Sequence, residues 1–507
     1  MNKIAVLVMS LILISKILGF TRDLLLSFFY GASVISDAYL ISQTIPMVIF
    51  SFVGIGIATA FIPVYIKIEN ESGTLDADKY TSNLVNIIFL FSSLVIGVSL
   101  IFVEQIVSIF ATGFEGEAYK LTVEFTRVSI WSIYGITLSY LFQAYLQVKG
   151  SYYAAAAMGL PLNIITISSI IISTYTQSIY LAIGGVIASF SQVFVQLFLI
   201  KKSKFKYRIT LDVFDTNIKK ILIVALPLIL GASIDQINIL VDRTLATSIA
   251  LGGVSALNYS NKLILFFHGI IVMSLVSVLY PTISRMVSEN KIDELKKEVS
   301  NTINVMMLFL IPASMICFFF SKDIIDILFN RGAFDETAFK LTSEALSFYS
   351  IGMFAIGARE VFSKIFYSME DTKTPMINAS VALTVNIFLN IILSRYMGLN
   401  GLALATSLSA ILSSLLMYRS LKNKIGKING NLILFNFSKI LFATIVSILM
   451  MMITINQLEN IMHRNFSFIF TLIIGSTLYF AILKIVRNKE VDMMIRFLKN
   501  KFFAYVN

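Results

Sequence analysis

The sequence predicts an all-α polytopic membrane protein, and its composition, its long apolar runs and the placement of its basic residues support this. Of the 507 residues, 57% are hydrophobic and only 14% are charged, whereas a soluble domain carries about 25% charged residues. The mean hydropathy is +0.84. So few charges cannot cover the surface of a soluble enzyme of this length. Disorder is also excluded, because chains this rich in aromatic residues bury themselves.

Apolar runs long enough to cross a bilayer as helices recur along the whole chain. A span needs about 20 predominantly apolar residues, and we count about 14 such runs. The first follows Met-Asn-Lys with no small-residue cleavage site behind it, so we interpret it as a span and not as a signal peptide. The runs begin near residues 3, 38, 81, 122, 152, 179, 220, 254, 300, 338, 376, 400, 436 and 466.

Lysine and arginine gather in alternate connectors, which predicts the orientation of the chain. The segment 201–220 carries a dense cluster of them, and 285–297, 419–427 and 484–489 carry others, whereas 31–36 and 249–255 carry none. By the positive-inside rule both termini are cytoplasmic. The net charge of +11 therefore reflects topology and attraction to anionic lipid headgroups, and gives no indication of nucleic-acid binding.

The two halves of the chain resemble each other, which predicts a parallel internal repeat. Matching pairs occur in the same order in both halves: Ile62-Pro63 with Tyr280-Pro281, residues 118–122 with 338–342, and Tyr145 with Tyr367. Six spans precede the second copy, so both copies enter the membrane in the same direction, as in transporters built from two rocking halves. The predicted domains are a six-helix N-lobe (1–210), a six-helix C-lobe (211–425) and a C-terminal helix pair (426–507).

Charged residues inside the apolar runs are the candidate functional groups. Such a residue costs at least about 2.5 kcal/mol in a span, so it faces a cavity or a partner. Arg22-Asp23 in the first span and Asp242-Arg243 in the seventh occupy equivalent positions in the two copies of the repeat. Lys16 and Lys262 have no carboxylate nearby in sequence. Either the pairs neutralise each other and hold helices together, or the cations line a cavity for an anionic headgroup.

Several other classes of protein are disfavoured by what the sequence lacks. It has no Walker A loop, no dinucleotide glycine fingerprint and no HExxH, which argues against ATP-driven transport within the chain and against an enzyme. One cysteine and two distant histidines exclude a disulfide scaffold and a His-based metal centre. A channel suits the parallel repeat less well than alternating access does.

The first span carries the motif Ser15-Lys16-Ile17-Leu18-Gly19-Phe20-Thr21-Arg22-Asp23. This stretch resembles the opening motif of the MurJ (MviN) family, the lipid II flippases of the multidrug/oligosaccharidyl-lipid/polysaccharide exporter superfamily. Further stretches fit the same family over the first 12 spans: Gly31-Ala32, Asp37-Ala38-Tyr39, Ile45-Pro46, residues 60–63 and residues 366–375.

The resemblance implies a central cationic cavity for the diphosphate and sugar of lipid II, with the lipid tail in a groove beside the last two helices. It assigns to the cavity Ser15, Lys16, Arg22, Asp23, Asp37 and Lys262. Lys16 and Lys262 stand where the family usually has arginine, which keeps the charge but loses the bidentate fork. Phe50 replaces a further cavity arginine, and Ile55 replaces an acidic residue.

The resemblance also implies a sodium site, as in sodium-coupled members. The matching groups are Asp242, Asn386, Asn390, the carbonyl of Leu402 and Thr406. All five offer oxygen ligands, and the two asparagines share one helix face. The alternative is that these asparagines only form hydrogen bonds between helices. No cofactor other than Na⁺ as a coupling ion is expected.

The expected function is a flippase that moves lipid II from the cytoplasmic to the outer leaflet of the bacterial cytoplasmic (inner) membrane. One rival is a flippase for another polyprenyl-diphosphate-linked glycan, and another is a cation-coupled multidrug exporter, which the basic residues argue against. We also expect an amphipathic cytoplasmic helix from Arg285 to Glu298, with Ile292, Leu295 and Val299 on one face. Such a helix either only joins two spans or docks cell-wall synthesis enzymes.

Overall fold

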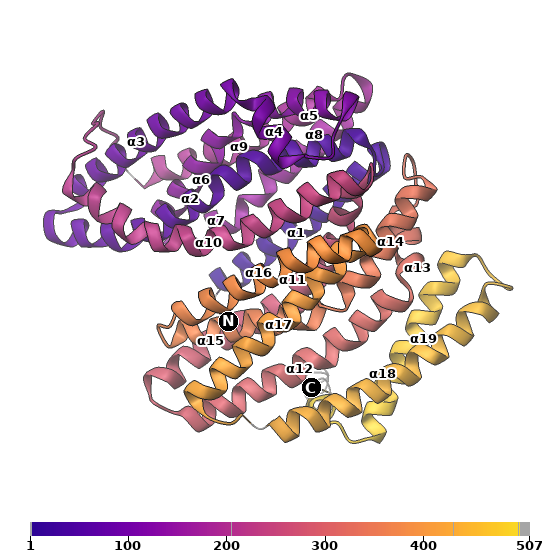
Figure 1. Cartoon of the computed structure of the whole chain (residues 1–507). Coiled ribbons are helices and arrows are strands. Elements are labelled where there is room, and N and C mark those ends of the chain that lie inside the picture. Colours follow the sequence, from indigo (N-terminus) through magenta and orange to yellow (C-terminus); the bar gives the residue numbers. More distant parts are fainter. Residues whose placement is uncertain (1–2, 204, 429, 495, 497–507) are drawn as a thin grey trace. The chain divides into compact units, whose positions relative to one another are not determined.

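The computed structural model describes residues 3–203, 205–428, 430–494 and 496, and every regular element in these ranges is a helix (Figure 1). The first ten helices are α1 (Lys3–Tyr30), α2 (Val34–Ser72), α3 (Thr74–Ile101), α4 (Val103–Phe110), α5 (Gly116–Ser129), α6 (Ser132–Val148), α7 (Tyr152–Ala157), α8 (Gly159–Tyr175), α9 (Ile179–Lys202) and α10 (Thr216–Ile249). They are followed by α11 (Gly253–Ser288), α12 (Ile292–Phe319), α13 (Ser321–Phe329), α14 (Glu336–Ser350), α15 (Met353–Ser368), α16 (Lys373–Met397), α17 (Leu399–Ile425), α18 (Gly430–Leu458) and α19 (Arg464–Ile485).

The chain divides into two compact units, which are described separately below. Unit 1 comprises Met1–Tyr259 with Arg331–Ala338, and unit 2 comprises Ser260–Asn330 with Phe339–Asn507. Helix α10 belongs to unit 1 because it packs along α2. The lobes at 1–210, 211–425 and 426–507 rest on the repeat and stay predictions, since packing and sequence duplication need not divide a chain at the same residue.

The all-helical membrane fold predicted from the sequence is confirmed. Among the described residues, eight helices are long and apolar enough to cross a bilayer: α3, α9, α11, α12, α16, α17, the Leu432–Leu458 part of α18, and α19. The runs expected near 122 and 338 are each divided into two shorter helices, α5 with α6 and α14 with α15. The count of about 14 spans therefore stays a prediction.

The order of the helices repeats along the chain in the way the sequence duplication predicts. Helix α3 has 28 residues and the short α4 has 8, and their counterparts α12 and α13 have 28 and 9. Helices α2 and α11 are both long, with 39 and 36 residues, and carry Pro63 and Pro281 in their interiors. Residues 118–122 and 338–342 lie near the starts of α5 and α14.

The prediction of a single amphipathic helix from Arg285 to Glu298 is wrong. Helix α11 ends at Ser288 and α12 begins at Ile292. Between them Asn290 adopts a left-handed conformation, with φ 55°, and Lys291 N donates to Met286 O at 2.9 Å. Asparagine tolerates this conformation, so it ends the helix. Leu295 and Val299 are fully buried, so the apolar stripe packs within unit 2.

An aromatic core holds α2, α3 and α6 together in unit 1. Phe61 and Tyr80 stack with ring centroids 5.9 Å apart, and Tyr65 meets Tyr145 edge to face at 5.6 Å. Lys149 lies over the Tyr65 ring, 4.9 Å from its centroid, and pairs with Glu69 at 2.7 Å. Offset and edge-to-face ring pairs of this kind add stability beyond the area they bury.

The basic connector after α9 forms hydrogen bonds with polar side chains along the start of α3. Asp78 accepts from Lys206 N at 3.1 Å, and Ser82 accepts from Arg208 N at 3.1 Å. The next residue of α3, Asn83, accepts at Oδ1 from Asp212 N at 2.7 Å, and its Nδ2 donates to the Asp212 carbonyl at 2.8 Å. These side chains supply the extended connector with the hydrogen-bond partners that a strand would otherwise supply.

Helices α18 and α19 lie side by side (Figure 1) and pack on α12 and α13 within unit 2. Phe320, Ile448 and Phe468 form the centre of the contact. Tyr479 donates to the Leu308 carbonyl at 2.7 Å, and Arg464 pairs with Asp323 at 2.9 Å. The last helix pair is therefore anchored by an apolar core and by polar contacts to two neighbouring helices.

Candidate functional site

Arg22 and Asp23, in the C-terminal half of α1, form an ion pair in unit 1. Arg22 Nε donates to Asp23 Oδ1 at 3.2 Å, and Nη2 donates to both carboxylate oxygens, at 3.0 and 3.3 Å. The Asp23 side chain is 4% exposed and that of Arg22 is 23% exposed. Each charge lowers the cost of burying the other.

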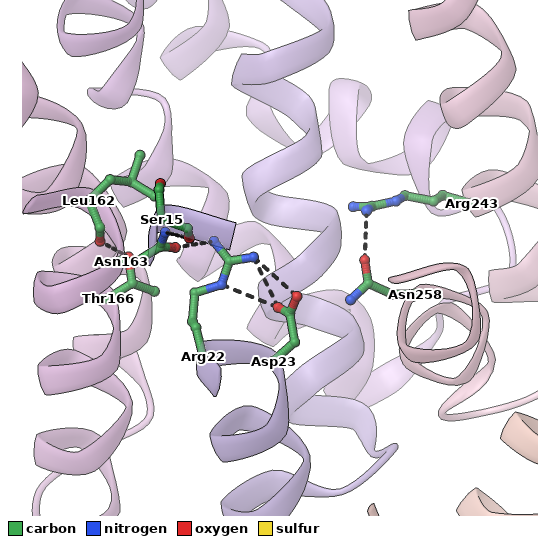
Figure 2. Close-up of polar contacts among 8 residues, drawn as sticks. All are labelled: Ser15, Arg22, Asp23, Leu162, Asn163, Thr166, Arg243 and Asn258. Atoms are coloured by element: carbon green, nitrogen blue, oxygen red, sulfur yellow. Dashed lines mark hydrogen bonds and ion pairs between the residues drawn. The ribbon is translucent and has the colours of Figure 1, made fainter. Parts of the chain in front are cut away.

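A third partner from α8 fixes the direction of the guanidinium. Arg22 Nη1 donates to Asn163 Oδ1 at 3.3 Å, and Asn163 Nδ2 donates to the Ser15 carbonyl at 3.0 Å (Figure 2). Ser15 is one of the predicted cavity residues, and its hydroxyl lies where a Cβ at Gly159 would be. Glycine at 159 therefore permits the close approach of α1 and α8 that brings Asn163 to Arg22.

Lys16 lies one residue after Ser15 on α1 and is partly buried. Among the described residues it makes no hydrogen bond or ion pair, in contrast to Arg22. Lys16 and Asp23 are seven residues apart, so they lie on nearly the same face of the helix. An ammonium that is held partly away from water without a carboxylate favours an anionic ligand.

Arg243, on α10, donates hydrogen bonds to three groups of unit 1. It donates to the Leu40 carbonyl at 2.9 Å, to the Thr44 hydroxyl, and to Asn258 Oδ1 at 3.3 Å. Figure 2 shows the guanidinium pointing at Asn258. Asp242, the preceding residue, is partly buried. This arginine therefore links α10 to α2 and to the start of α11.

The predicted cavity residue Asp37 lies at the start of α2 and is fully buried. Its carboxylate accepts from Gly252 N at 2.8 Å and Ser255 N at 2.7 Å, and also from the Ser255 hydroxyl. These amides are at the N-terminus of α11, where the helix dipole favours a negative charge. Both carboxylate oxygens are thus engaged by protein donors.

The remaining cavity positions fall in different surroundings. Phe50 is 1% exposed, and its ring lies 5.8 Å from that of Phe91 on α3, so the phenyl group is part of the packing of unit 1. The Ile55 side chain lies outside the described residues. Lys262 lies on α11 in unit 2 and is partly buried.

Four of the five predicted sodium ligands lie on α16 and α17, which pack together in unit 2. Asn386 and Asn390 are buried, and Asn390 Nδ2 donates to Asn386 Oδ1 at 2.8 Å. Thr406 donates to the Leu402 carbonyl at 3.1 Å. Two of the expected ligand oxygens thus accept protein hydrogen bonds. The fifth group, Asp242, lies in unit 1.

The sequence did not single out Asn163, Ser255 or Ser409. Asn163 is a lone amide in the apolar α8, which could have marked it as the partner of a charge. Ser409 accepts from Asn386 Nδ2 at 3.2 Å and so joins α17 to α16. Ser255 follows the pair Gly252-Gly253, a pattern typical of a helix start, but nothing local links it to Asp37.

Charged side chains paired inside apolar helices, on a helix order that occurs twice, define a multi-pass membrane transporter. Residues 26–477 match the family model described as lipid II flippase MurJ. The chain belongs to the MurJ family of lipid II flippases. It is therefore a transporter and not an enzyme.

Curated relatives agree over most of the chain. The probable lipid II flippase of Rickettsia prowazekii is 26% identical over 478 residues, covering 92% of this chain and 93% of the relative. That of Buchnera aphidicola subsp. Acyrthosiphon pisum is 28% identical over 461 residues, covering 88% and 89%.

Solved structures agree on the fold. A lipid II flippase MurJ in an inward closed conformation is 26% identical with a TM-score of 0.82, covering 95% of this chain and 98% of that one. An inward-facing MATE-family multidrug transporter is 13% identical with a TM-score of 0.66, covering 83% of this chain and 98% of that one. The second likeness concerns the fold alone.

Proposed function

We propose that this chain moves lipid II from the cytoplasmic to the outer leaflet of the bacterial cytoplasmic membrane by alternating access. The observation that carries the proposal is the arrangement around Arg22. A guanidinium on an apolar helix is neutralised by Asp23 and oriented by Asn163, and the Arg22 side chain as a whole stays partly exposed. Such a group can bind a phosphate oxygen while the protein is closed to bulk water.

In this proposal Arg22, Lys16 and Lys262 bind the diphosphate. Arg22 supplies directed donors, and the two lysines supply compact charges that tolerate several orientations of the phosphates. Asp23 prevents Arg22 from holding the diphosphate too tightly for release. A multidrug exporter for cationic drugs would need the opposite charge in its cavity, so these residues argue against that alternative.

The contact of Asp37 with the start of α11 acts in the proposal as the outer closure. The connectors 31–33 and 250–252 lie on the side that the positive-inside rule assigns to the outside. Breaking the carboxylate's three hydrogen bonds lets α11 separate from α2 and opens an exit. Because the broken bonds are to a charged acceptor, each contributes about 1.5–3 kcal/mol net of the bonds that water makes in exchange.

We further propose Na⁺ or the membrane potential as the energy source. One charge moving through 100 mV is worth about 2.3 kcal/mol, enough to bias the return step. Sodium at Asn386, Asn390, Thr406 and the Leu402 carbonyl would require Asn390 and Thr406 to turn their donors away from the ligand oxygens. Asp242 would supply the charge.

Both termini lie in the cytoplasm in this proposal. Contacts with cell-wall synthesis enzymes would have to use exposed polar surface there, because Leu295 and Val299 are buried.

The test is flipping of lipid II in proteoliposomes by charge variants of Arg22. Arg22→Glu should abolish flipping, because it places two carboxylates where the diphosphate binds, and Arg22→Lys should retain part of it. Arg208→Glu, a reversal in the exposed connector after α9, is the matched control and should flip normally. Wild-type flipping by Arg22→Glu would overturn the assignment. Another polyprenyl-diphosphate glycan flipped in preference to lipid II would overturn the substrate.

A further inference from the structure

A cationic cavity that the Arg22 site does not contribute to lies in unit 2. It has a volume of about 420 Å³ and is formed where the start of α12, the α17–α18 connector and the segment after α19 meet. Lysines from all three segments line it: Lys296 and Lys297, Lys427, and Lys489. Three separate segments of the chain therefore place four cations around one cavity.

The charge of this cavity is far from balanced by the chain itself. Asp293 is the one carboxylate-bearing residue on its wall in the described part of the chain, and it pairs with Lys296 at 3.1 Å. Its side chain is 97% exposed, whereas that of Lys296 is 25% exposed. Lys297, Lys427 and Lys489 make no ion pair with a described residue. Like charges gathered in this way repel each other unless an anion joins them.

A buried hydroxyl on the same wall points to a ligand independently of the charges. Ser300 lines the cavity and is 2% exposed, and its Oγ has no hydrogen-bond partner among the described residues. A buried hydroxyl without a partner costs about 1–3 kcal/mol. Other serines of unit 2 instead donate to a carbonyl three residues earlier, as Ser414 does to Ile411 at 3.2 Å. An anion in the cavity would accept the Ser300 proton.

The edge of the cavity shows what kind of molecule carries that anion. Leu432, at the start of α18, lines the cavity and is 47% exposed. Further along α18, Phe435 and Phe442 are 59% and 58% exposed. An exposed apolar strip thus begins at the cationic cavity. The positive-inside rule assigns this end of the helices to the cytoplasmic surface, at the depth of the lipid headgroups.

We propose that this cavity binds the phosphate of an anionic phospholipid from the cytoplasmic leaflet, with its acyl chains along the exposed face of α18. The three lysines without a carboxylate and the Ser300 hydroxyl contact the phosphate. The bound lipid joins α12 to the last helix pair, because its ligands come from both. This site is independent of lipid II flipping and adds a structural lipid to the protein.

The test compares lipid binding by matched double variants of the full chain. Binding of phosphatidylglycerol is titrated in mixed micelles with phosphatidylcholine and measured by native mass spectrometry and by the thermal unfolding midpoint. Each lysine near an anionic headgroup is worth about a fivefold change in affinity. Lys427→Gln with Lys489→Gln should weaken binding by roughly 25-fold and abolish the rise in midpoint.

The matched control is Lys422→Gln with Lys484→Gln, which removes two exposed lysines from the ends of α17 and α19 outside the cavity. This control should bind as the wild type does, and Lys427→Arg with Lys489→Arg should also retain binding. Ser300→Ala should weaken binding without removing a charge. Equal loss in the cavity and control variants would overturn the site, and an equal rise in midpoint with inorganic phosphate would overturn the lipid as its occupant.

Discussion

At the scale of single residues, the sequence indicated which charges are paired locally but not which distant side chains complete them. Arg22 and Asp23 are neighbours, so their pairing could be predicted from sequence, and it is confirmed at 3.0 Å. Asn163 lies 141 residues away from Arg22 in the chain. Nothing local specifies that contact, because it depends on the packing of α1 against α8.

Removing the amide of Asn163 tests whether flipping depends on the orientation of the Arg22 guanidinium. Asn163→Ala leaves Arg22 bound to Asp23 alone, so the guanidinium loses one fixed direction. A single polar contact between membrane helices is worth about 0.6–1.7 kcal/mol. We therefore expect flipping in proteoliposomes to fall by roughly threefold to twentyfold. Unchanged flipping would show that Asp23 alone positions Arg22.

The buried carboxylate of Asp37 is the second test at this scale. Asp37→Asn keeps the shape but brings an NH₂ group toward the amides of Gly252 and Ser255, which can only donate. We expect the free energy of unfolding to fall by about 1–3 kcal/mol, measured as thermal stability in detergent. Ser255→Ala keeps the amide and should cost less. Equal stability of Asp37→Asn and the wild type would contradict the role of the charge.

At the scale of elements, the apolar runs predict where helices start. The errors in the predicted helices arise where the backbone turns. The run expected near 254 begins at Gly253, and that near 400 begins at Leu399. The helix from Arg285 to Glu298 was predicted because the apolar spacing continues through this segment. In the structure Asn290 adopts a left-handed conformation and makes a turn within it. Periodicity reports which face is apolar, and does not show where the backbone turns.

Asp371 joins two helices and should make stability depend on pH. It lies in the connector before α16, accepts from Thr374 N at 2.9 Å and pairs with Lys424 at the end of α17 at 2.6 Å. Burial raises the pKa of Asp371, but the bonds from Lys424 and Thr374 outweigh it and lower the pKa from 3.8 to about 2. Its stabilising contribution is therefore complete above about pH 4 and is lost as the pH falls toward 2.

We expect Asp371→Asn to lower the thermal midpoint at pH 7, because it removes this carboxylate's bonds to Lys424 and Thr374. Since the pair is partly exposed, the cost is about 1 kcal/mol or less. The difference from the wild type should shrink as the pH is lowered from 4 to 2, where the wild-type carboxylate is also neutralised. A difference that stays constant over this range would contradict the account.

At the scale of the whole molecule, the sequence indicated the membrane fold and the family, while packing added the division of the chain. The duplication predicted that α10 begins a second lobe, and by contacts α10 groups with unit 1. Helix α10 packs along α2, and its Arg243 donates to the Leu40 carbonyl and the Thr44 hydroxyl. The period of the repeat alone therefore does not show to which unit this helix belongs. Composition and apolar runs were sufficient for the membrane fold because they do not depend on which helices meet.

The orientation of the whole chain can be tested with single cysteines, since the native Cys317 is buried. In a Cys317→Ala background, Lys201→Cys in intact cells should resist a reagent that does not cross the membrane, and Tyr175→Cys should react. Tyr175 is the last residue of α8, Lys201 lies at the end of α9, and both are exposed. Labelling of Lys201→Cys from outside would reverse the topology that the positive-inside rule predicts.

The most direct measurement of the central claim is replacement of the native lipid II flippase in a bacterium depleted of it, scored by lipid II reaching the outer leaflet. The account predicts that the wild-type chain restores outer-leaflet lipid II and that Arg22→Glu, present in the membrane at the same level, does not. Restoration by both chains would contradict the role of Arg22. Failure of the wild-type chain despite verified membrane insertion would contradict lipid II as its substrate.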